Sequence, residues 1–318
     1  MALIGTDIEH AAKLIETGEV IGIPTETVYG LAGNAFNTDA VTRIFKIKKR
    51  PSFDPLIVHT DSLSKIRGFV KAIPESALKL AECSWPGPLT LLLPKKNIIP
   101  DLVTSGLPDV AVRIPDHATT LALLQRLAFP LAAPSANPFS YVSPTSAQHV
   151  NDQLGDKIPY ILNGGGSTVG IESTIIGFEN NQPIVYRLGG LAIKKIEEVV
   201  GKVKVMAHSS SDPTTPGSLK SHYAPDKKVI IGDIKQLINT YKDRRFALLS
   251  FQKYYEGIPA ENQLVLSATG DLDEAAKNLF SGLRQLDKLP VEYIFSELVP
   301  PEDLGLAIND RLKRAAAK

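Results

Sequence analysis

A polar run from His208 to Ser218 is the feature that most constrains how this chain can fold. It consists almost wholly of serine, threonine, proline, aspartate and glycine, and a segment of that composition has no apolar face to bury. The chain has 318 residues, which is too many for a single small hydrophobic core. We therefore predict two folded units, at 1–205 and 227–318, joined at 206–226 by a linker that can close over a site as a lid.

The first unit has the pattern of a mixed sheet. Several apolar segments follow one another without a helix between them, which favours a twisted mixed sheet over a doubly wound parallel one. Strands are expected at 20–23, 55–59, 89–93, 110–114, 130–133, 159–162, 172–178 and 183–187. Helices are expected at 7–17, 62–71, 74–84, 117–128, 145–154 and 192–200, and from an N-cap at Asp39 to a point before Pro51.

The second unit alternates strands and helices. Strands are expected at 228–232, 246–251, 263–267 and 291–295, and helices at 233–241, 271–288 and 303–317. This alternation is typical of a small α/β domain of Rossmann-like character. The whole chain is thus assigned to the α/β (α+β) class.

Composition excludes several classes of function. The formal net charge is +1, so no overall field attracts nucleic acid or a membrane, and an RNA contact would need a local patch. The single cysteine, Cys83, excludes an internal disulfide, and its helical apolar context predicts a buried side chain. No apolar run is long enough to span a bilayer, and the first residues lack a basic signal-peptide start. We expect a cytoplasmic enzyme.

Two polar clusters flank the helix that ends before Pro51. The segment 25–29 places two threonines, Glu26 and a tyrosine after a buried strand, where sites often lie, although capping threonines explain it equally well. Lys48, Lys49 and Arg50 end the helix, and their side chains are expected to leave it together. Among them, Lys48 and Arg50 can clamp phosphates. Their charges also suit the helix dipole. His59 ends the next strand, where a core or edge role is the alternative.

Further polar side chains stand at the ends of other strands. Ser135 and Asn137 are two residues apart after an apolar strand, so both can face one cavity. Ser143 and Thr145 begin a helix, where hydroxyls can bind an anion, cap the helix, or both.

Arg113 and Arg187 stand in otherwise apolar strands and need a partner. The candidates are an anionic ligand or the carboxylates of Glu26, Asp54 and Glu172.

The set as a whole is rich in cations and neutral donors. The sequence has no G-x-x-x-x-G-K-[ST] phosphate loop, no paired-histidine metal motif and no evident Ser-His-Asp relay. Such a site is suited to binding and orienting anions. Adenylate formation needs a site of this kind, because positioning and charge stabilisation supply most of its catalysis.

The chain resembles the two-domain threonylcarbamoyl-adenylate synthases, whose first domain has the YrdC-like fold. The resemblance covers the first two-thirds of the chain in the right order, and the remainder matches only by position and α/β character. The matching segments are Pro24–Leu31, Lys48–Pro51, Asp54–His59, Trp85–Thr90, Val110–Pro115, Ala133–Asn137, Gly170–Thr174, Arg187–Gly189 and Thr215–Pro225.

The resemblance implies a reaction of L-threonine, bicarbonate and ATP that gives threonylcarbamoyl-AMP and pyrophosphate. It implies that ATP carries Mg²⁺ into the site, and we assign no protein ligands to this ion. It also implies that a downstream transferase complex modifies tRNAs reading codons that start with A. It implies catalytic roles for Lys48, Arg50 and Arg113. The implied threonine ligands are Thr27, His59, Arg113, Ser135 and Ser173. The implied ATP ligands are Lys48, Arg50, Asp54, Asn137, Ser143, Thr145, Arg187 and Tyr223.

Two rival functions share the fold. A YrdC-like domain can be an RNA-binding translation or assembly factor, but the near-zero net charge and the lid-like linker favour an enzyme. A carbamoyl-transfer enzyme of hydrogenase maturation would carry cysteine-rich zinc segments, which a single cysteine excludes. The family often has asparagine where this chain has Asp54, and an acid there would repel triphosphate unless Mg²⁺, Lys48 or Arg50 intervenes. Lys49 should point elsewhere and be dispensable.

Overall fold

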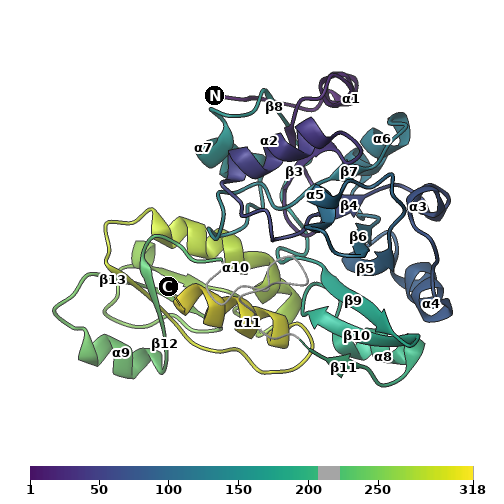
Figure 1. Cartoon of the computed structure of the whole chain (residues 1–318). Helices are drawn as coiled ribbons and strands as arrows, with labels where there is room; N and C mark the ends of the chain where they lie inside the picture. Colours follow the sequence, from purple (N-terminus) through teal and green to yellow (C-terminus); the bar gives the residue numbers. More distant parts are fainter. Residues whose placement is uncertain (207–222, 318) are drawn as a thin grey trace.

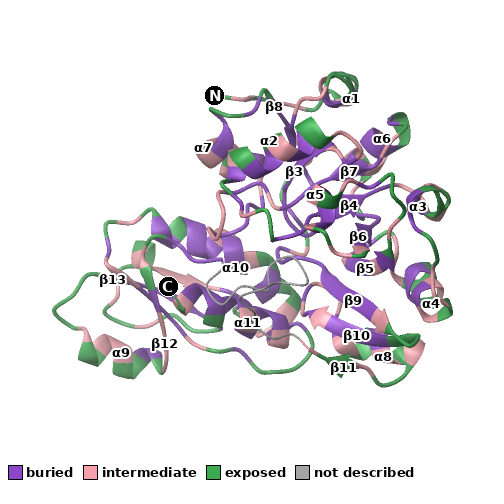
Figure 2. Cartoon of the chain, in the orientation of Figure 1, coloured by how far each residue is buried: buried purple, intermediate pink, exposed green. Residues whose placement is uncertain are grey.

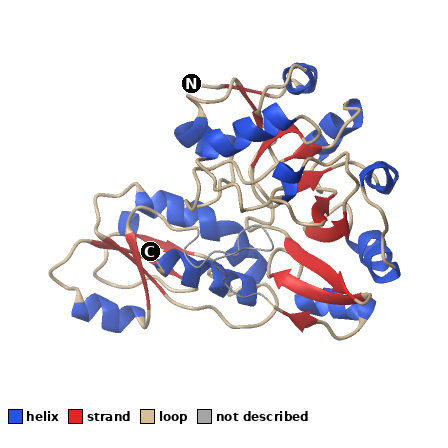
Figure 3. Cartoon of the chain, viewed as in Figure 1, coloured by secondary structure: helices blue, strands red, loops and turns tan. Residues whose placement is uncertain are grey.

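The computed structural model describes residues 1–206 and 223–317, and it contains two sheets (Figures 1 and 3). The first is an 11-stranded mixed sheet in the order β1-β8-β2-β3-β7-β4-β6-β5-β9-β10-β11. The second has the order β12-β15-β13-β14, and its neighbouring strands are all parallel. The predicted mixed sheet and the smaller Rossmann-like unit are both confirmed. The predicted lid lies mostly outside the described residues.

The strands of the first sheet are short and run through the first part of the chain. They are β1 (Leu3–Gly5), β2 (Ile21–Ile23), β3 (Gly30–Asn34), β4 (Ile57–His59), β5 (Leu89–Pro94), β6 (Asp109–Arg113), β7 (Leu131–Ala132), β8 (Tyr160–Leu162), β9 (Thr174–Glu179), β10 (Gln182–Arg187) and β11 (Lys204–Val205). The accompanying helices are α1 (Ile8–Glu16), α2 (Thr38–Lys48), α3 (Leu63–Phe69), α4 (Glu75–Ser84), α5 (Asp101–Thr104), α6 (Ala118–Arg126), α7 (Ala147–Leu154) and α8 (Ile193–Val200).

The second sheet alternates with helices as predicted. Its elements are β12 (Lys228–Ile231), α9 (Ile234–Thr240), β13 (Phe246–Ser250), the 3-10 helix η1 (Ala260–Asn262), β14 (Gln263–Val265), α10 (Leu272–Asp287), β15 (Tyr293–Ser296) and α11 (Gly305–Ala316). Helices α10 and α11 pack on one face of this sheet, and α9 packs on the other.

Three local predictions were wrong. Asn37, and not Asp39, caps α2, because its side chain accepts hydrogen bonds from two backbone N–H groups of the first turn. Lys48 and Arg50 are buried while Lys49 is exposed, so the three side chains do not leave the helix together; Lys49 adopts a left-handed φ of 53° that separates its neighbours. Cys83 is exposed and not buried.

The face of the first sheet that carries the pocket is only partly covered by helices. Leu131 packs in the core that α1 and α6 form on that face. His59 of β4 is the register partner of Leu131 and also of Arg113, and register partners point to the same side of a sheet. His59 and Arg113 therefore lie on the continuation of that face, where polar side chains replace the apolar core.

The two units share a buried apolar cluster. Figure 2 colours much of α10 and α11 as buried. Val28, Val142 and Ile171 of the first unit belong to the same core as the inner faces of α10 and α11. This packing brings helices of the second unit close to the loops that follow β2 and precede β9. Across the two described stretches, no helix is long and apolar enough to cross a membrane.

Candidate active site

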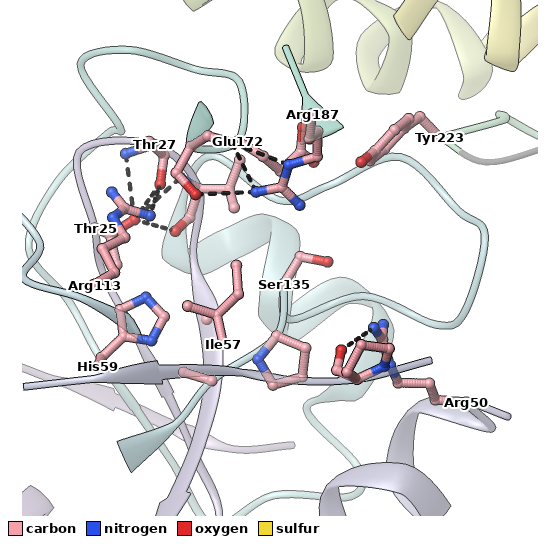
Figure 4. Close-up of a pocket in the computed structure, with 16 residues that line it drawn as sticks. Thr25, Thr27, Arg50, Ile57, His59, Arg113, Ser135, Glu172, Arg187 and Tyr223 are labelled. Carbon is pink, nitrogen blue, oxygen red and sulfur yellow. Dashed lines mark hydrogen bonds between the residues drawn. The ribbon is translucent and has the colours of Figure 1, made fainter. Parts of the chain in front are cut away.

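A pocket opens on this face of the first sheet (Figure 4), and the empty space in and in front of it, open solvent included, is about 560 Å³. Its walls come from the loop after β2, from β4, from the end of β6, from the segment after β7, and from the end of the antiparallel β9–β10 pair at which β9 begins and β10 ends. The lining residues are Thr25, Thr27, Val28, Gly30, Arg50, Pro55, Ile57, His59, Arg113, Ala133, Pro134, Ser135, Glu172, Ser173, Arg187 and Tyr223.

Arg113 is fixed at one end of the pocket by three partners. Its Nη2 lies 2.6 Å from Glu26 Oε1 in a buried ion pair. Its Nη1 donates to Thr27 Oγ1 at 2.8 Å, and its Nε donates to the carbonyl of Gly87 at 3.2 Å. Of the candidate carboxylates, Glu26 is the one that pairs with Arg113. A guanidinium held this firmly presents a fixed charge to a ligand carboxylate.

His59 is a neutral group beside that cation. Burial, together with the positive charge of Arg113, lowers the pKa of His59 to about 3. Within residues 1–206 and 223–317, its buried Nδ1 has no hydrogen-bond partner. The neutral imidazole can therefore donate a hydrogen bond to a ligand or accept one from it without adding charge to the site.

Ser173 and Arg187 form a further part of the wall. The hydroxyl of Ser173 lies 2.7 Å from Thr90 Oγ1 and accepts from Arg187 Nη2 at 3.0 Å. Arg187 also donates to the carbonyl of Ser173. Burial lowers the pKa of Arg187 to about 10, so the guanidinium stays charged at neutral pH.

Arg50 is oriented by its own loop. Its Nη2 lies 2.8 Å from Asp54 Oδ1, and it donates to the carbonyls of Asp54 and Pro55. Asp54 is fully buried and does not line the pocket. Of the three groups named as possible counterweights to the charge of Asp54, Arg50 is the one that forms an ion pair with it.

The other predicted ATP ligands lie behind the pocket wall. The amine of Lys48 donates to the carbonyls of Ser135 and Asn137, each at 2.6 Å, and burial lowers its pKa well below the usual range. Ser143 donates to Glu172 Oε1 at 2.6 Å. Thr145 lies near the imidazole of His149.

Asn137 also faces its own loop. Its side-chain amide donates to the carbonyls of Pro138 and Tyr141, each at 2.8 Å. None of Lys48, Asn137, Ser143 and Thr145 lines the pocket. These four groups shape the loops around the cavity, and their predicted contacts with ATP stay a prediction.

Two features of the site were missed by the sequence reasoning. Thr25 lines the pocket, and its hydroxyl lies 2.8 Å from that of Thr27. Glu172 was expected to pair with a strand arginine, but its ion-pair partner is Arg311 of α11, with Oε2 to Nε at 3.0 Å. No local signal points to Arg311, because its partner lies far away in the sequence.

The arrangement suits the binding of anions at two ends. Arg113 stands at one end among hydroxyls and a neutral imidazole, while Arg50 and Arg187 serve the other. Fixed cations and hydroxyl donors in a largely buried cavity stabilise negative charge without reorganisation. In the described stretches, no group of three or more His, Cys, Asp or Glu side chains could hold a metal ion.

The sheet order and the pocket place the chain among α/β proteins with a YrdC-like first domain. The family model described as "Telomere recombination" (Sua5_yciO_yrdC) matches residues 13–189, and the model described as "Threonylcarbamoyl-AMP synthase, C-terminal domain" (Sua5_C) matches residues 191–317. The chain belongs to the Sua5/YciO/YrdC family and has the two-domain form. The family predicted from the sequence motifs is confirmed.

Several relatives match over nearly the whole chain. A threonylcarbamoyl-AMP synthase of Pyrococcus abyssi (strain GE5 / Orsay) is 39% identical over 97% of this chain and 94% of its own. One of Bacillus subtilis (strain 168) is 38% identical over 97% and 92%. The crystal structure of P. abyssi Sua5 complexed with L-threonine has a TM-score of 0.93 and 37% identity, covering 99% of this chain and 97% of that one.

Proposed function

We propose that this protein is an L-threonylcarbamoyladenylate synthase, a nucleotidyltransferase that joins L-threonine, bicarbonate and ATP into threonylcarbamoyl-AMP with release of pyrophosphate. One observation carries the proposal. The five residues expected to hold threonine all line a single pocket, and the fold matches a Sua5 structure described as complexed with L-threonine. The residues concerned are Thr27, His59, Arg113, Ser135 and Ser173.

The threonine end is built around Arg113. Its guanidinium would bind the substrate carboxylate, while the hydroxyls of Thr27 and Ser173 and the imidazole of His59 would fix the rest of the molecule. Because His59 stays neutral, it would not repel the substrate ammonium group.

The nucleotide end would use Arg50, Arg187 and Tyr223, which line the pocket. Asp54 would act by orienting Arg50. Lys48 would act by holding the carbonyls of Ser135 and Asn137, so its role would be positional, and any direct contact of Lys48, Asn137, Ser143 or Thr145 with ATP would need movement of these loops.

Mg²⁺ would enter with the triphosphate. The two carboxylates nearest the nucleotide end, Asp54 and Glu172, are each engaged by an arginine, so this part of the chain offers no carboxylate cage for a cation. We assign no protein ligand to Mg²⁺ and no catalytic step to it.

The reaction would proceed in two stages. The threonine amine takes up bicarbonate with loss of water and forms a carbamate. A carbamate oxygen then attacks the α-phosphorus of ATP, and the bond to the leaving pyrophosphate breaks. The protein's contribution is to hold the carbamate and the phosphates in line and to neutralise their charge with Arg50 and Arg187.

The product would pass to a transferase that modifies tRNAs reading codons that start with A, in the cytoplasm. The RNA-binding alternative is not favoured, because the full-length relatives are named as synthases and the net charge is only +1.

The proposal is tested with purified protein, Mg²⁺-ATP, bicarbonate and L-threonine, by measuring pyrophosphate release. Release should require threonine, and release that is independent of threonine would refute the assignment. Arg50→Ala should chiefly raise the KM for ATP and Arg113→Ala the KM for threonine. Lys49→Ala, which alters an exposed side chain of the same loop, is the control. An equal rise of both KM values in both arginine variants would refute the division of roles.

A further inference from the structure

Arg311 belongs to the second domain but reaches the wall of the candidate active site. It stands on α11, is fully buried, and its Nε donates to Glu172 Oε2 at 3.0 Å. We propose that Arg311 is a positioning residue for this site: it neutralises Glu172 and holds Tyr223, so that the second domain keeps the nucleotide end of the pocket ready for ATP. This inference rests on the proposed function.

Glu172 places a carboxylate at the end of the pocket that we assign to the phosphates of ATP. It lines the pocket, is 7% exposed, and receives one hydrogen bond from Ser143 and one from Arg311. Figure 4 draws it beside Arg187, with Tyr223 next along the wall. Without Arg311, its negative charge would repel the triphosphate and draw Arg187 towards itself. The ion pair with Arg311 removes that competition.

Tyr223 depends on the same side chain. The guanidinium of Arg311 lies 5.1 Å from the centroid of the Tyr223 ring, a cation–π distance. Phe280 of α10 stacks on the same ring with centroids 5.5 Å apart. Tyr223 has a φ of 63°, which a bulky residue adopts only when tertiary contacts hold it there. Both described aromatic contacts come from the second domain.

One ion pair between the domains lies away from the pocket. Lys288, which directly follows α10, pairs with Asp152 of α7 at 2.8 Å, and the lysine side chain is 68% exposed. Neither residue lines the pocket. Lys288→Met therefore removes an interdomain ion pair without touching the site, and it is a matched control for Arg311→Met.

The test compares wild type, Arg311→Met, the double variant Arg311→Met/Glu172→Gln, and Lys288→Met. Both KM values are measured by pyrophosphate release, and the Kd for ATP is measured by calorimetry. We expect Arg311→Met to raise the KM and the Kd for ATP about tenfold or more, with the threonine KM within roughly twofold. The double variant should recover part of the ATP affinity, because Glu172 no longer carries an unpaired charge, although Tyr223 still lacks its contact with Arg311. Lys288→Met should match wild type.

Each outcome decides the proposal. Unchanged ATP affinity in folded Arg311→Met overturns it. An equal loss of affinity for ATP and threonine that Glu172→Gln does not rescue also overturns it, because a merely structural defect would behave in that way. If Arg311→Met does not fold, a double variant that folds again supports the proposal, because removing the Glu172 charge then relieves the defect, and a double variant that also fails to fold overturns it. If the wild type binds ATP but releases no threonine-dependent pyrophosphate, the proposed function is refuted. The Kd values for ATP in the variants then still decide whether Arg311 positions the ATP site.

Discussion

Removing the charge of Glu26 should leave a buried cation without its counter-ion. Glu26 and Arg113 are 5% and 4% exposed, and their nearest oxygen and nitrogen are 2.6 Å apart. Glu26→Gln keeps the shape of the side chain and leaves Arg113 with the neutral partners Thr27 and Gly87. At about 4 Å between charge centres and an effective dielectric of about 20, the lost attraction is ~4 kcal/mol. Breaking one side of a buried pair costs a similar ~3–5 kcal/mol.

L-Threonine should reverse part of this loss, because its carboxylate would supply the missing negative charge. Ligand at 100 times its Kd stabilises a protein by about 2.7 kcal/mol, and the gain should be larger in Glu26→Gln than in wild type. Urea unfolding, followed by the fluorescence of the single tryptophan, Trp85, reports on the first domain. The measurement is made with and without threonine.

Two further variants make the test specific. Glu75→Gln removes an exposed carboxylate that pairs with Lys79 at 2.8 Å, and it should change stability little. Adding Arg113→Met to Glu26→Gln should restore stability and abolish the effect of threonine, since no unpaired charge remains. If Glu26→Gln is as stable as wild type, or if threonine stabilises both proteins equally, the account of Arg113 as the carboxylate ligand is wrong.

The remaining predictions concern Lys48 and His59. Lys48→Met should lower activity at least about tenfold, because it releases the carbonyls that set the pocket loop, whereas Lys49→Met should leave the rate unchanged in the same pyrophosphate assay. The pKa of His59 is about 3 in the folded protein and near 6.5 when unfolded. As the pH falls from 6.5 to 5, only the unfolded state takes up that proton, so the unfolding free energy should drop by about 2 kcal/mol more in wild type than in His59→Gln. If the unfolding free energy falls equally with pH in both proteins, the burial of a neutral imidazole is contradicted.

Local patterns predicted most of the elements. The strands β9 and β10 and the helix α10 lie close to their predicted ranges, since apolar runs and an amphipathic period mark them clearly. Strand β3 was not predicted, because Gly30–Asn34 contains two glycines and reads as a turn. It exists because β2 and β7 pair with it on both sides, and such pairing overrides weak strand propensity.

The exposure of Cys83 shows the same limit. The apolar period around it fits a helix, and α4 does form there. The buried side of α4 is nevertheless the side of Ala77, Leu80 and Ala81, which leaves Cys83 in solvent. Which face of a helix packs inwards is decided by the neighbouring elements when the apolar stripe is broad.

The sequence by itself determined the two units, the family, and the chemistry of the pocket, because these depend on residue types, their order and their spacing. The tertiary structure decided which of those residues share a cavity. The register of β4 against β6 brings His59 beside Arg113, while the fold turns the amine of Lys48 towards backbone carbonyls. It also brings Arg311 to Glu172, since long-range packing sets distances that sequence spacing does not contain.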